Sequence, residues 1–407
     1  MTDTLWSLIT APWALQPDTL VGAAVLALLA ALLGEMVWRR LCWPRLLGYS
    51  VVGTAVALTG GGASGHEPAL RLAVDGALAL LLFEAGARLN LRWLARNPWL
   101  LATSLAEAAL AAAAVWLVLR SLAVAPDVAA PLALIAASAS PAVLQRVVGE
   151  MRAAGQVTER LLALAALNTL YAVLALKLFS AGLLLSDPST WLNAVSPVLF
   201  SFCGSILLGA ALGEGLALIA RRFDLREDNA MVLLLAAVLL ALVIAKTLQL
   251  SALLVPLLAG IWLRNRSERP WVWPRHFGSA GGLLMLVLFV AVASAWRFDS
   301  LGATLGVAAA LVLARTVAKA TAVLLLARPS GLGLSQALCL GSALLPMSAT
   351  AWVMALEFSL HHPAAGAQLM PVLLTCLALL ELSAPLVVMA SLRAAGEIDV
   401  QTRSRNA

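Results

Sequence analysis

Apolar runs of about 20 residues recur along the whole chain. A helix of that length crosses the hydrocarbon core of a bilayer, so each run is a candidate transmembrane span. Of the 407 residues, 62% are hydrophobic and only 12% are charged. A soluble domain has roughly 25% charged residues. The sequence therefore predicts an all-α polytopic membrane protein with no room for a large soluble domain.

The runs divide into about 13 spans. Two of them, 46–61 and 251–264, are short, and Pro256 is expected to break the second. The boundary near Leu250 can also be drawn as one long span. The expected spans are residues 18–38, 46–61, 69–87, 97–120, 128–147, 158–184, 193–220, 229–249, 251–264, 277–296, 301–327, 333–357 and 368–392.

Arginines alternate from loop to loop in this arrangement. Every second loop is rich in arginine, and the opposite loops hold only Arg71, Arg120 and Arg297. Positive loops stay cytoplasmic, which predicts an outside N-terminus and a cytoplasmic tail at 393–407. The arginine-rich loops include Arg39, Arg40 and Arg45; Arg88, Arg92 and Arg96; Arg146, Arg152 and Arg160; Arg221, Arg222 and Arg226; and Arg264, Arg266, Arg269 and Arg275.

Several other classes of function find no support in the sequence. The net charge of +6 is explained by membrane-facing loops, so no nucleic-acid partner is expected. Four separated cysteines form no CxxC pair, and the histidines give no metal pattern, so we expect no cofactor and no resident metal. The start of the chain lacks the basic region of a cleavable signal. No nucleophile–base constellation or phosphate loop indicates an enzyme.

Two spans contain helix breakers near mid-membrane. The fifth has Ser138 and Ser140 before Pro141, and the twelfth has Pro346 and Ser348. Either break alone is explained equally well by a kinked helix that only packs against its neighbours or by a functional site. The two lie seven spans apart, so 18–184 and 229–392 become halves of opposite topology joined by the helix 193–220. Interrupted helices at matching places in inverted halves are typical of a transporter site.

Charged residues also occur within the predicted spans. Glu107, Arg315 and Glu381 lie near the middle, and Glu84 and Lys319 lie nearer the cytoplasmic ends. A central charge costs about 2.5–3.5 kcal/mol, so it usually faces a partner or water. Arg315 and Lys319 are four residues apart and share one helical face. We expect at least one glutamate within salt-bridge reach of them, either as a structural pair or as part of a site.

The helix 165–177, "AALNTLYAVLALK", carries three polar residues, namely Asn168, Thr169 and Lys177. Thr169 is readily explained by a hydrogen bond between helices. Lys177 lies about two and a half turns beyond Asn168, and we expect it to extend toward the membrane surface.

Four segments together resemble monovalent cation/proton antiporters of the sodium/proton exchanger type. They are "LLLFEAGARLNLRWLARN", "SASPAVLQRVVGEMRAAGQVTERLLALAALN", "LARTVAKATAVLLLAR" and "GLGLSQALCLGSALLPMSATAWVMAL". Each motif is degenerate, but their order and spacing are specific. The resemblance implies a 13-span homodimer in a bacterial inner membrane, with two crossed, unwound helices that hold Na⁺ or K⁺ and an elevator-like motion.

One position departs from the family pattern. The family has Asn-Asp or Asp-Asp in the middle of the helix after the first broken span, and here the pair is Asn168-Thr169. Ser138, Ser140, Asn168 and Thr169 offer neutral oxygens to a cation. A threonine hydroxyl does not titrate in the physiological range, so it cannot exchange a cation for a proton.

Three functions stay open from sequence alone. The first is an antiporter whose proton carrier has moved to Glu84, Glu107 or Glu381. The second is a degenerate antiporter fold that acts as a regulator or partner subunit. The third is a transporter of another small solute on the same scaffold. The persistent breaks and mid-span charges favour the first.

Overall fold

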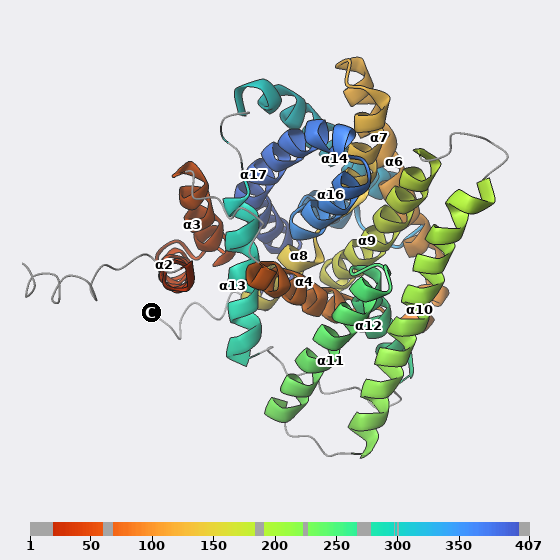
Figure 1. The fold of residues 1–407 in the computed structure, drawn as a ribbon. Coiled ribbons are helices and arrows are strands. Elements are labelled where there is room, and N and C mark those ends of the chain that lie inside the picture. The colour runs from red at the N-terminus through yellow and green to blue at the C-terminus, as the bar shows by residue number, and fades with distance from the viewer. Residues whose placement is uncertain are drawn as a thin grey trace, which may run out of the picture.

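The structure is a computed structural model that describes residues 19–59, 68–183, 191–222, 227–266, 278–296, 298 and 301–398. These residues form α-helices and no strand, which confirms the predicted fold class (Figure 1). The helices are α2 (Thr19–Leu41), α3 (Leu46–Leu58), α4 (Pro68–Arg88), α5 (Leu91–Arg96), α6 (Pro98–Ser121), α7 (Pro126–Ala137), α8 (Pro141–Met151), α9 (Gln156–Leu183), α10 (Trp191–Arg222), α11 (Glu227–Thr247), α12 (Leu254–Arg266), α13 (Gly278–Ser294), α14 (Leu301–Leu325), α15 (Leu334–Ala343), α16 (Ala349–His361) and α17 (Pro363–Ala394).

Seven segments of the described chain are long and apolar enough to cross a bilayer, and shorter apolar helices accompany them. The predicted spans agree with the helices to within a few residues; the fourth, 97–120, is α6 at Pro98–Ser121. The count of 13 spans stays a prediction. Arg297 and the side chain of Arg71 lie outside the described residues, as do several loop arginines used for the predicted orientation.

Three details differ from the sequence prediction. Pro256 does not break a helix, because it lies in the first turn of α12. The N–H groups of a first turn have no acceptor within the helix, so a proline there removes no helical hydrogen bond. The region near Leu250 separates α11 from α12 and does not continue one long helix. The short helix α5 was not predicted; the Asn90 side chain caps it by accepting a bond from Trp93 N at 3.1 Å.

The helices pack in two groups. α6–α9 and α14–α17 contact mainly one another, and we call them the crossing group because both broken spans belong to it. α2–α4 and α10–α13 form the flanking group. Figure 1 shows α14, α16 and α17 close to α6, α7 and α9, with α10, α11 and α12 on the other side of α4. The crossing group holds every candidate site residue except Glu84, which is on α4.

Reciprocal glycines bring α4 and α12 into backbone contact. A Cβ on Gly86 would collide with the Leu257 carbonyl, and a Cβ on Gly260 would collide with the Phe83 carbonyl. Small residues allow such close approach between membrane helices, where packing replaces the hydrophobic effect as the driving force. The two helices therefore form a rigid pair within the flanking group.

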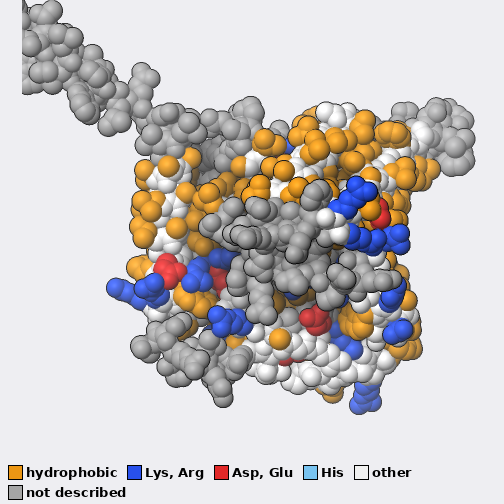
Figure 2. Space-filling view, turned by 90° about the horizontal axis from the view of Figure 1, so that it is seen from below, with side chains coloured by type: hydrophobic (Ala, Val, Ile, Leu, Met, Phe, Trp, Pro, Cys, Tyr) orange, Lys and Arg blue, Asp and Glu red, His pale blue; other side chains and the backbone are white. Residues whose placement is uncertain are grey.

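The surface matches an environment of lipid. Large apolar side chains are exposed on several helices, including Leu207 on α10, Val232 on α11 and Leu325 on α14. On the face shown in Figure 2, hydrophobic side chains cover the upper edge and most of the visible Lys and Arg lie below it. Apolar exposure on this scale indicates a bilayer-embedded protein.

The helix α17 ends at Ala394, within two residues of the predicted start of the tail. Just beyond it, Glu397 caps the start of α9. Its carboxylate accepts bonds from Val157 N at 2.6 Å and from Thr158 N and Oγ1, both at 2.7 Å. A carboxylate at a helix N-terminus satisfies free N–H groups and complements the helix dipole. Residues 399–407 lie outside the described chain.

Candidate ion site

Both predicted breaks are present, and they meet. The first lies between α7 and α8 at Ser138–Ser140, and the second lies between α15 and α16 at Leu344–Ser348. Proline disfavours a helical conformation in the residue before it, and Ser140 is accordingly extended before Pro141. The backbone N–H of Ser140 donates to the carbonyl of Pro346 at 2.9 Å, which joins the two unwound segments directly.

Arg315 connects the two breaks. It is fully buried, and its guanidinium has donors in a fixed fork that one side chain can direct to several acceptors. The acceptors are the backbone carbonyls that the two breaks leave without a helical partner. The guanidinium therefore satisfies the C-terminal ends of α7 and α15 together, and its charge complements both dipoles. Its contacts are to the oxygens of Ala136 (2.7 Å), Ser138 (2.6 Å) and Leu345 (2.6 Å), with longer ones to Leu344 (3.3 Å) and Pro346 (3.4 Å).

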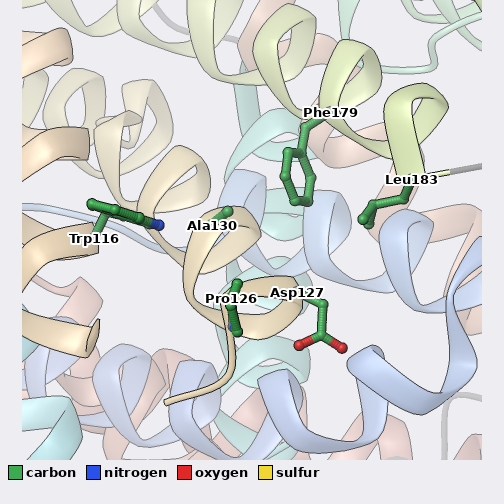
Figure 3. Close-up of a pocket in the computed structure, with 6 residues that line it drawn as sticks. All are labelled: Trp116, Pro126, Asp127, Ala130, Phe179 and Leu183. Carbon is green, nitrogen blue, oxygen red and sulfur yellow. The ribbon is translucent and has the colours of Figure 1, made fainter. Parts of the chain in front are cut away.

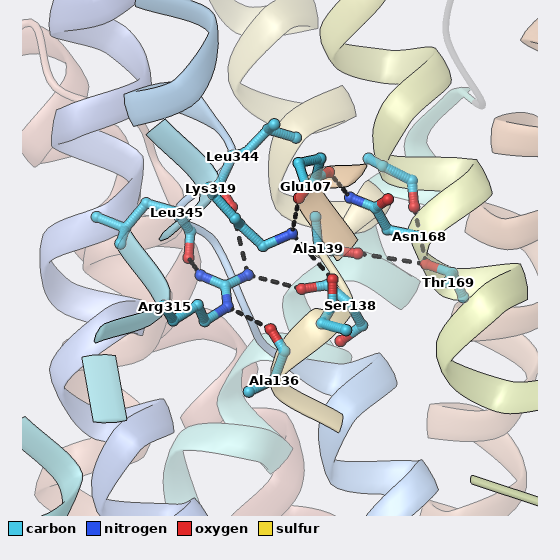
Figure 4. Close-up of polar contacts among 12 residues, drawn as sticks. Glu107, Ala136, Ser138, Ala139, Asn168, Thr169, Arg315, Lys319, Leu344 and Leu345 are labelled. Carbon is cyan, nitrogen blue, oxygen red and sulfur yellow. Dashed lines mark hydrogen bonds and ion pairs between the residues drawn. The ribbon is translucent and has the colours of Figure 1, made fainter. Parts of the chain in front are cut away.

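Glu107 lies between a cation and an amide (Figure 4). Its Oε2 is 2.5 Å from Nζ of Lys319, one turn beyond Arg315 on α14. Its Oε1 accepts a hydrogen bond from Nδ2 of Asn168 on α9. Lys319 also donates to the carbonyl of Ala137 at 2.9 Å. Glu107 thus has both oxygens engaged, and the expected pairing of the basic pair with a glutamate is confirmed for Lys319.

Thr169 connects α9 to the first break. Its hydroxyl lies 3.0 Å from the carbonyl of Ala165, one turn earlier, and 3.3 Å from the carbonyl of Ala139. Ser138 is turned toward its own helix, where its hydroxyl donates to Ile135 O at 2.7 Å. Each hydroxyl proton is thus used within the protein, and the lone pairs of the oxygen stay open to a ligand. The contacts of Thr169 agree with the expected role of its hydroxyl in a hydrogen bond between helices.

Some buried oxygens near the two breaks have no hydrogen-bond partner in the described chain. Most buried polar groups are hydrogen-bonded, so each such atom indicates a water, an ion or a titrating role. The atoms concerned are Ser140 Oγ, Asn168 Oδ1, Thr350 Oγ1 and Glu381 Oε2. Ser140 belongs to the first unwound segment, Thr350 lies in the first turn after the second, and Asn168 contacts Glu107. The meeting point of the breaks is therefore the best candidate for an ion site.

Comparison with known families agrees with this geometry. Residues 24–392 match the family model described as sodium/hydrogen exchanger, transmembrane. The chain belongs to the sodium/hydrogen exchanger family. A search of curated proteins found no match.

Two solved structures of the sodium proton antiporter MjNhaP1 from Methanocaldococcus jannaschii are similar to this chain in fold. One has a TM-score of 0.66 at 18% identity and covers 92% of this chain and 100% of that chain. The other has a TM-score of 0.70 at 16% identity and covers 94% of this chain and 99% of that chain. The chain therefore has the fold of these antiporters over nearly its whole length.

The other two glutamates named from sequence lie apart from the Glu107 contacts. Glu84 pairs with Arg88, one turn along α4, at 2.8 Å. Glu381 on α17 accepts a bond from the Ser348 hydroxyl at 2.8 Å and makes no ion pair with a described residue. Lys177 does not simply extend to the surface as expected; it pairs with Glu357 of α16 at 2.8 Å.

One surface pocket lies away from the meeting point of the two breaks. It is lined by residues of α6, α7 and α9, and the one charged side chain among them is Asp127 (Figure 3). None of the residues at the meeting point of the breaks contributes to it. No sequence pattern indicates the backbone carbonyls that hold Arg315, because every residue type supplies the same carbonyl group.

Proposed function

We propose that this protein is a secondary active transporter that moves a monovalent cation, Na⁺ or K⁺, in exchange for protons. The observation that carries the proposal is the orientation of Asn168. Its amide nitrogen is held by Glu107, while its carbonyl oxygen is buried and has no partner in the described chain. A buried free carbonyl oxygen beside a carboxylate suits a hard cation.

The cation ligands follow from the same contacts. We assign Asn168 Oδ1 and Ser140 Oγ as neutral oxygen ligands, since both are buried and unpartnered. Glu107 supplies negative charge next to them but is already shared with Lys319. Thr169 holds the helix α9 against the first break by its contact with Ala139. The site thus differs from the family pattern in having no carboxylate at residue 169.

The proposed transport cycle uses the two helix groups. The crossing group, with the ion site, slides against the flanking group in an elevator-like motion. The rigid contact of α4 with α12 through Gly86 and Gly260 suits a static flanking group. In this proposal residues 18–184 and 229–392 are inverted repeats joined by the helix 193–220, here α10. The protein is a homodimer in a bacterial inner membrane, with an outside N-terminus and a cytoplasmic C-terminus.

Flux in proteoliposomes tests the proposal. The purified protein should acidify or alkalinise the lumen when a Na⁺ or K⁺ gradient is imposed, as reported by a pH-sensitive dye. Asn168→Leu should lower this flux at least about tenfold, because it removes both the ligand oxygen and the contact with Glu107. Thr247→Leu is the control and should not change it, because Thr247 is an exposed residue of α11 whose hydroxyl bonds the Ile244 carbonyl in its own helix.

Two outcomes would contradict the proposal. If wild-type protein shows no flux with Na⁺, K⁺ or Li⁺, a degenerate fold that serves as a regulator or partner subunit is the better reading. If cation gradients leave the lumenal pH unchanged but a gradient of another small solute changes it, the protein transports that solute.

A further inference from the structure

Proton-coupled exchange needs a group that gains and loses a proton at the site. The residue that has this part in the family pattern is threonine here, and its hydroxyl does not titrate in the physiological range. Glu84 is held by Arg88, away from the breaks. Glu150 on α8 has a side chain that is only 4% exposed, but it is held by Arg146 at 2.7 Å. The other buried carboxylates that contact the crossing group in the described chain are Glu107 and Glu381.

Glu107 is poorly suited to this task. Both of its oxygens are engaged, one with Lys319 and one with Asn168. Adding a proton would leave the ammonium of Lys319, which is 1% exposed, without its counter-charge. A buried charge that loses its partner is strongly unfavourable. Glu107 therefore acts as the fixed counter-ion of α14.

Glu381 has the opposite properties. It is 2% exposed, one oxygen accepts from Ser348 at 2.8 Å, and the other oxygen has no partner in the described chain. It can take up a proton without breaking any ion pair. Its free oxygen also gives a proton or a cation a place to bind.

Its place in the fold matches that of the missing carboxylate. α9 follows the first broken span and α17 follows the second. Thr169 on α9 contacts Ala139 in the first break, and Glu381 on α17 contacts Ser348 in the second. In the proposed repeat arrangement, the last helix of each half thus touches its own break, and the carboxylate is on the second half.

From these contacts we infer that Glu381 is the proton-binding carboxylate of the transport cycle, and that Ser348 positions it. The inference rests on the proposed exchange. When a proton binds to Glu381, the carboxylate becomes neutral and the cation leaves; when a cation enters, the proton goes to solvent. One proton therefore replaces one unit of cation charge at the breaks.

Charged groups near Glu381 come from α17 itself and from the helices that pack against it. These helices are α3, α7, α8, α13, α14, α15 and α16. None of their described basic side chains forms an ion pair with it. The titratable and charged residues on them and on α17 are Tyr49, Asp127, Arg146, Glu150, Arg315, Lys319, Cys339, Glu357, His361, Cys376 and Arg393.

The pH dependence of Na⁺ exchange tests this inference. Two measurements are made in proteoliposomes: Na⁺-driven proton movement, and exchange of radioactive Na⁺ for Na⁺ at several pH values, each equal on both sides. In wild-type protein the exchange should weaken as the pH falls, because protons compete with the cation for Glu381. Glu381→Gln should lower proton movement at least tenfold. Its Na⁺ exchange should be weaker than in wild type, because the neutral amide mimics the protonated carboxyl, and should no longer depend on pH. Glu84→Gln, a buried but ion-paired glutamate, should change neither.

The other results are equally decisive. Retained proton coupling in Glu381→Gln would overturn the inference, and so would Na⁺ exchange that still depends on pH as in wild type. Absence of both fluxes in wild-type protein would instead overturn the proposed function. Ser348→Ala keeps the carboxylate and gives a second check. It should move the pH profile of exchange to higher pH, since it removes a donor that favours the charged form. An unchanged profile would argue against Ser348 as the positioning residue.

Discussion

Lys319 Nζ and Glu107 Oε2 lie 2.5 Å apart, with side-chain exposures of 1% and 0%. Removing one partner of such a pair leaves an unpaired buried charge. We expect Glu107→Gln to lower the free energy of unfolding by about 3–5 kcal/mol. Thermal unfolding in detergent, followed by intrinsic fluorescence, measures the effect.

The double variant Glu107→Gln with Lys319→Met is the informative control for this pair. It removes both charges and should regain most of the lost stability. Glu84→Gln breaks a pair whose Arg88 side chain is 42% exposed, and should cost only about 0–1 kcal/mol. Equal losses in the single and double variants would mean that the pair is not the source of the destabilisation.

Arg315→Lys should destabilise the protein although the positive charge is kept. A single ammonium cannot reproduce the guanidinium fork that reaches carbonyls of both breaks. Each charged hydrogen bond contributes about 1.5–3 kcal/mol, so a loss of at least about 2 kcal/mol is expected in thermal unfolding. Arg120→Lys is the control, because Arg120 is exposed and its hydrogen bond to the Val124 carbonyl, at 2.6 Å, lies at the surface. Comparable stability of the two variants would contradict the bridging role of Arg315.

Thr169→Asp should increase cation-dependent proton flux. The hydroxyl it replaces lies beside the carbonyl oxygens of Ala139 and Ala165, so a carboxylate there faces acceptors on two sides. It needs a proton or a cation between itself and those oxygens, which is the competition that drives exchange. Thr169→Asn has a similar shape without titration and should show no gain. If wild-type protein is inactive and only Thr169→Asp is active, the native protein is not an exchanger.

Gly260→Ala should destabilise the pairing of α12 with α4. The added methyl group meets the Phe83 carbonyl, and overpacking of this kind costs about 1–3 kcal/mol. Gly306→Ala on α14 is the control: nothing lies within 4 Å of the new Cβ, so helix propensity should leave stability unchanged or raise it by up to about 1 kcal/mol. A similar melting temperature for both variants would show that α4 and α12 can move apart at low cost.

The sequence predicted the helices, the breaks and the pairing of a basic residue with a glutamate because each has a local sign. Span length, proline and a charge in an apolar run are visible without coordinates. The choice of Glu107 as the partner of Lys319 was not visible, since it depends on how α6 packs against α14. The pairing of Lys177 with Glu357 was missed for the same reason, because the two lie on different helices.

The reach of Arg315 has a consequence for biosynthesis. Residues 136 and 315 are 179 positions apart in the chain. At a synthesis rate of about 5–20 residues per second, Arg315 is added to the chain roughly 10–35 s after the carbonyls of the first break that it binds. During that time α7 and α8 are already made but their unwound segment has no protein partner for those oxygens. The first half therefore cannot reach its final structure by itself, and maturation of the ion site begins only when the eleventh predicted span has been inserted.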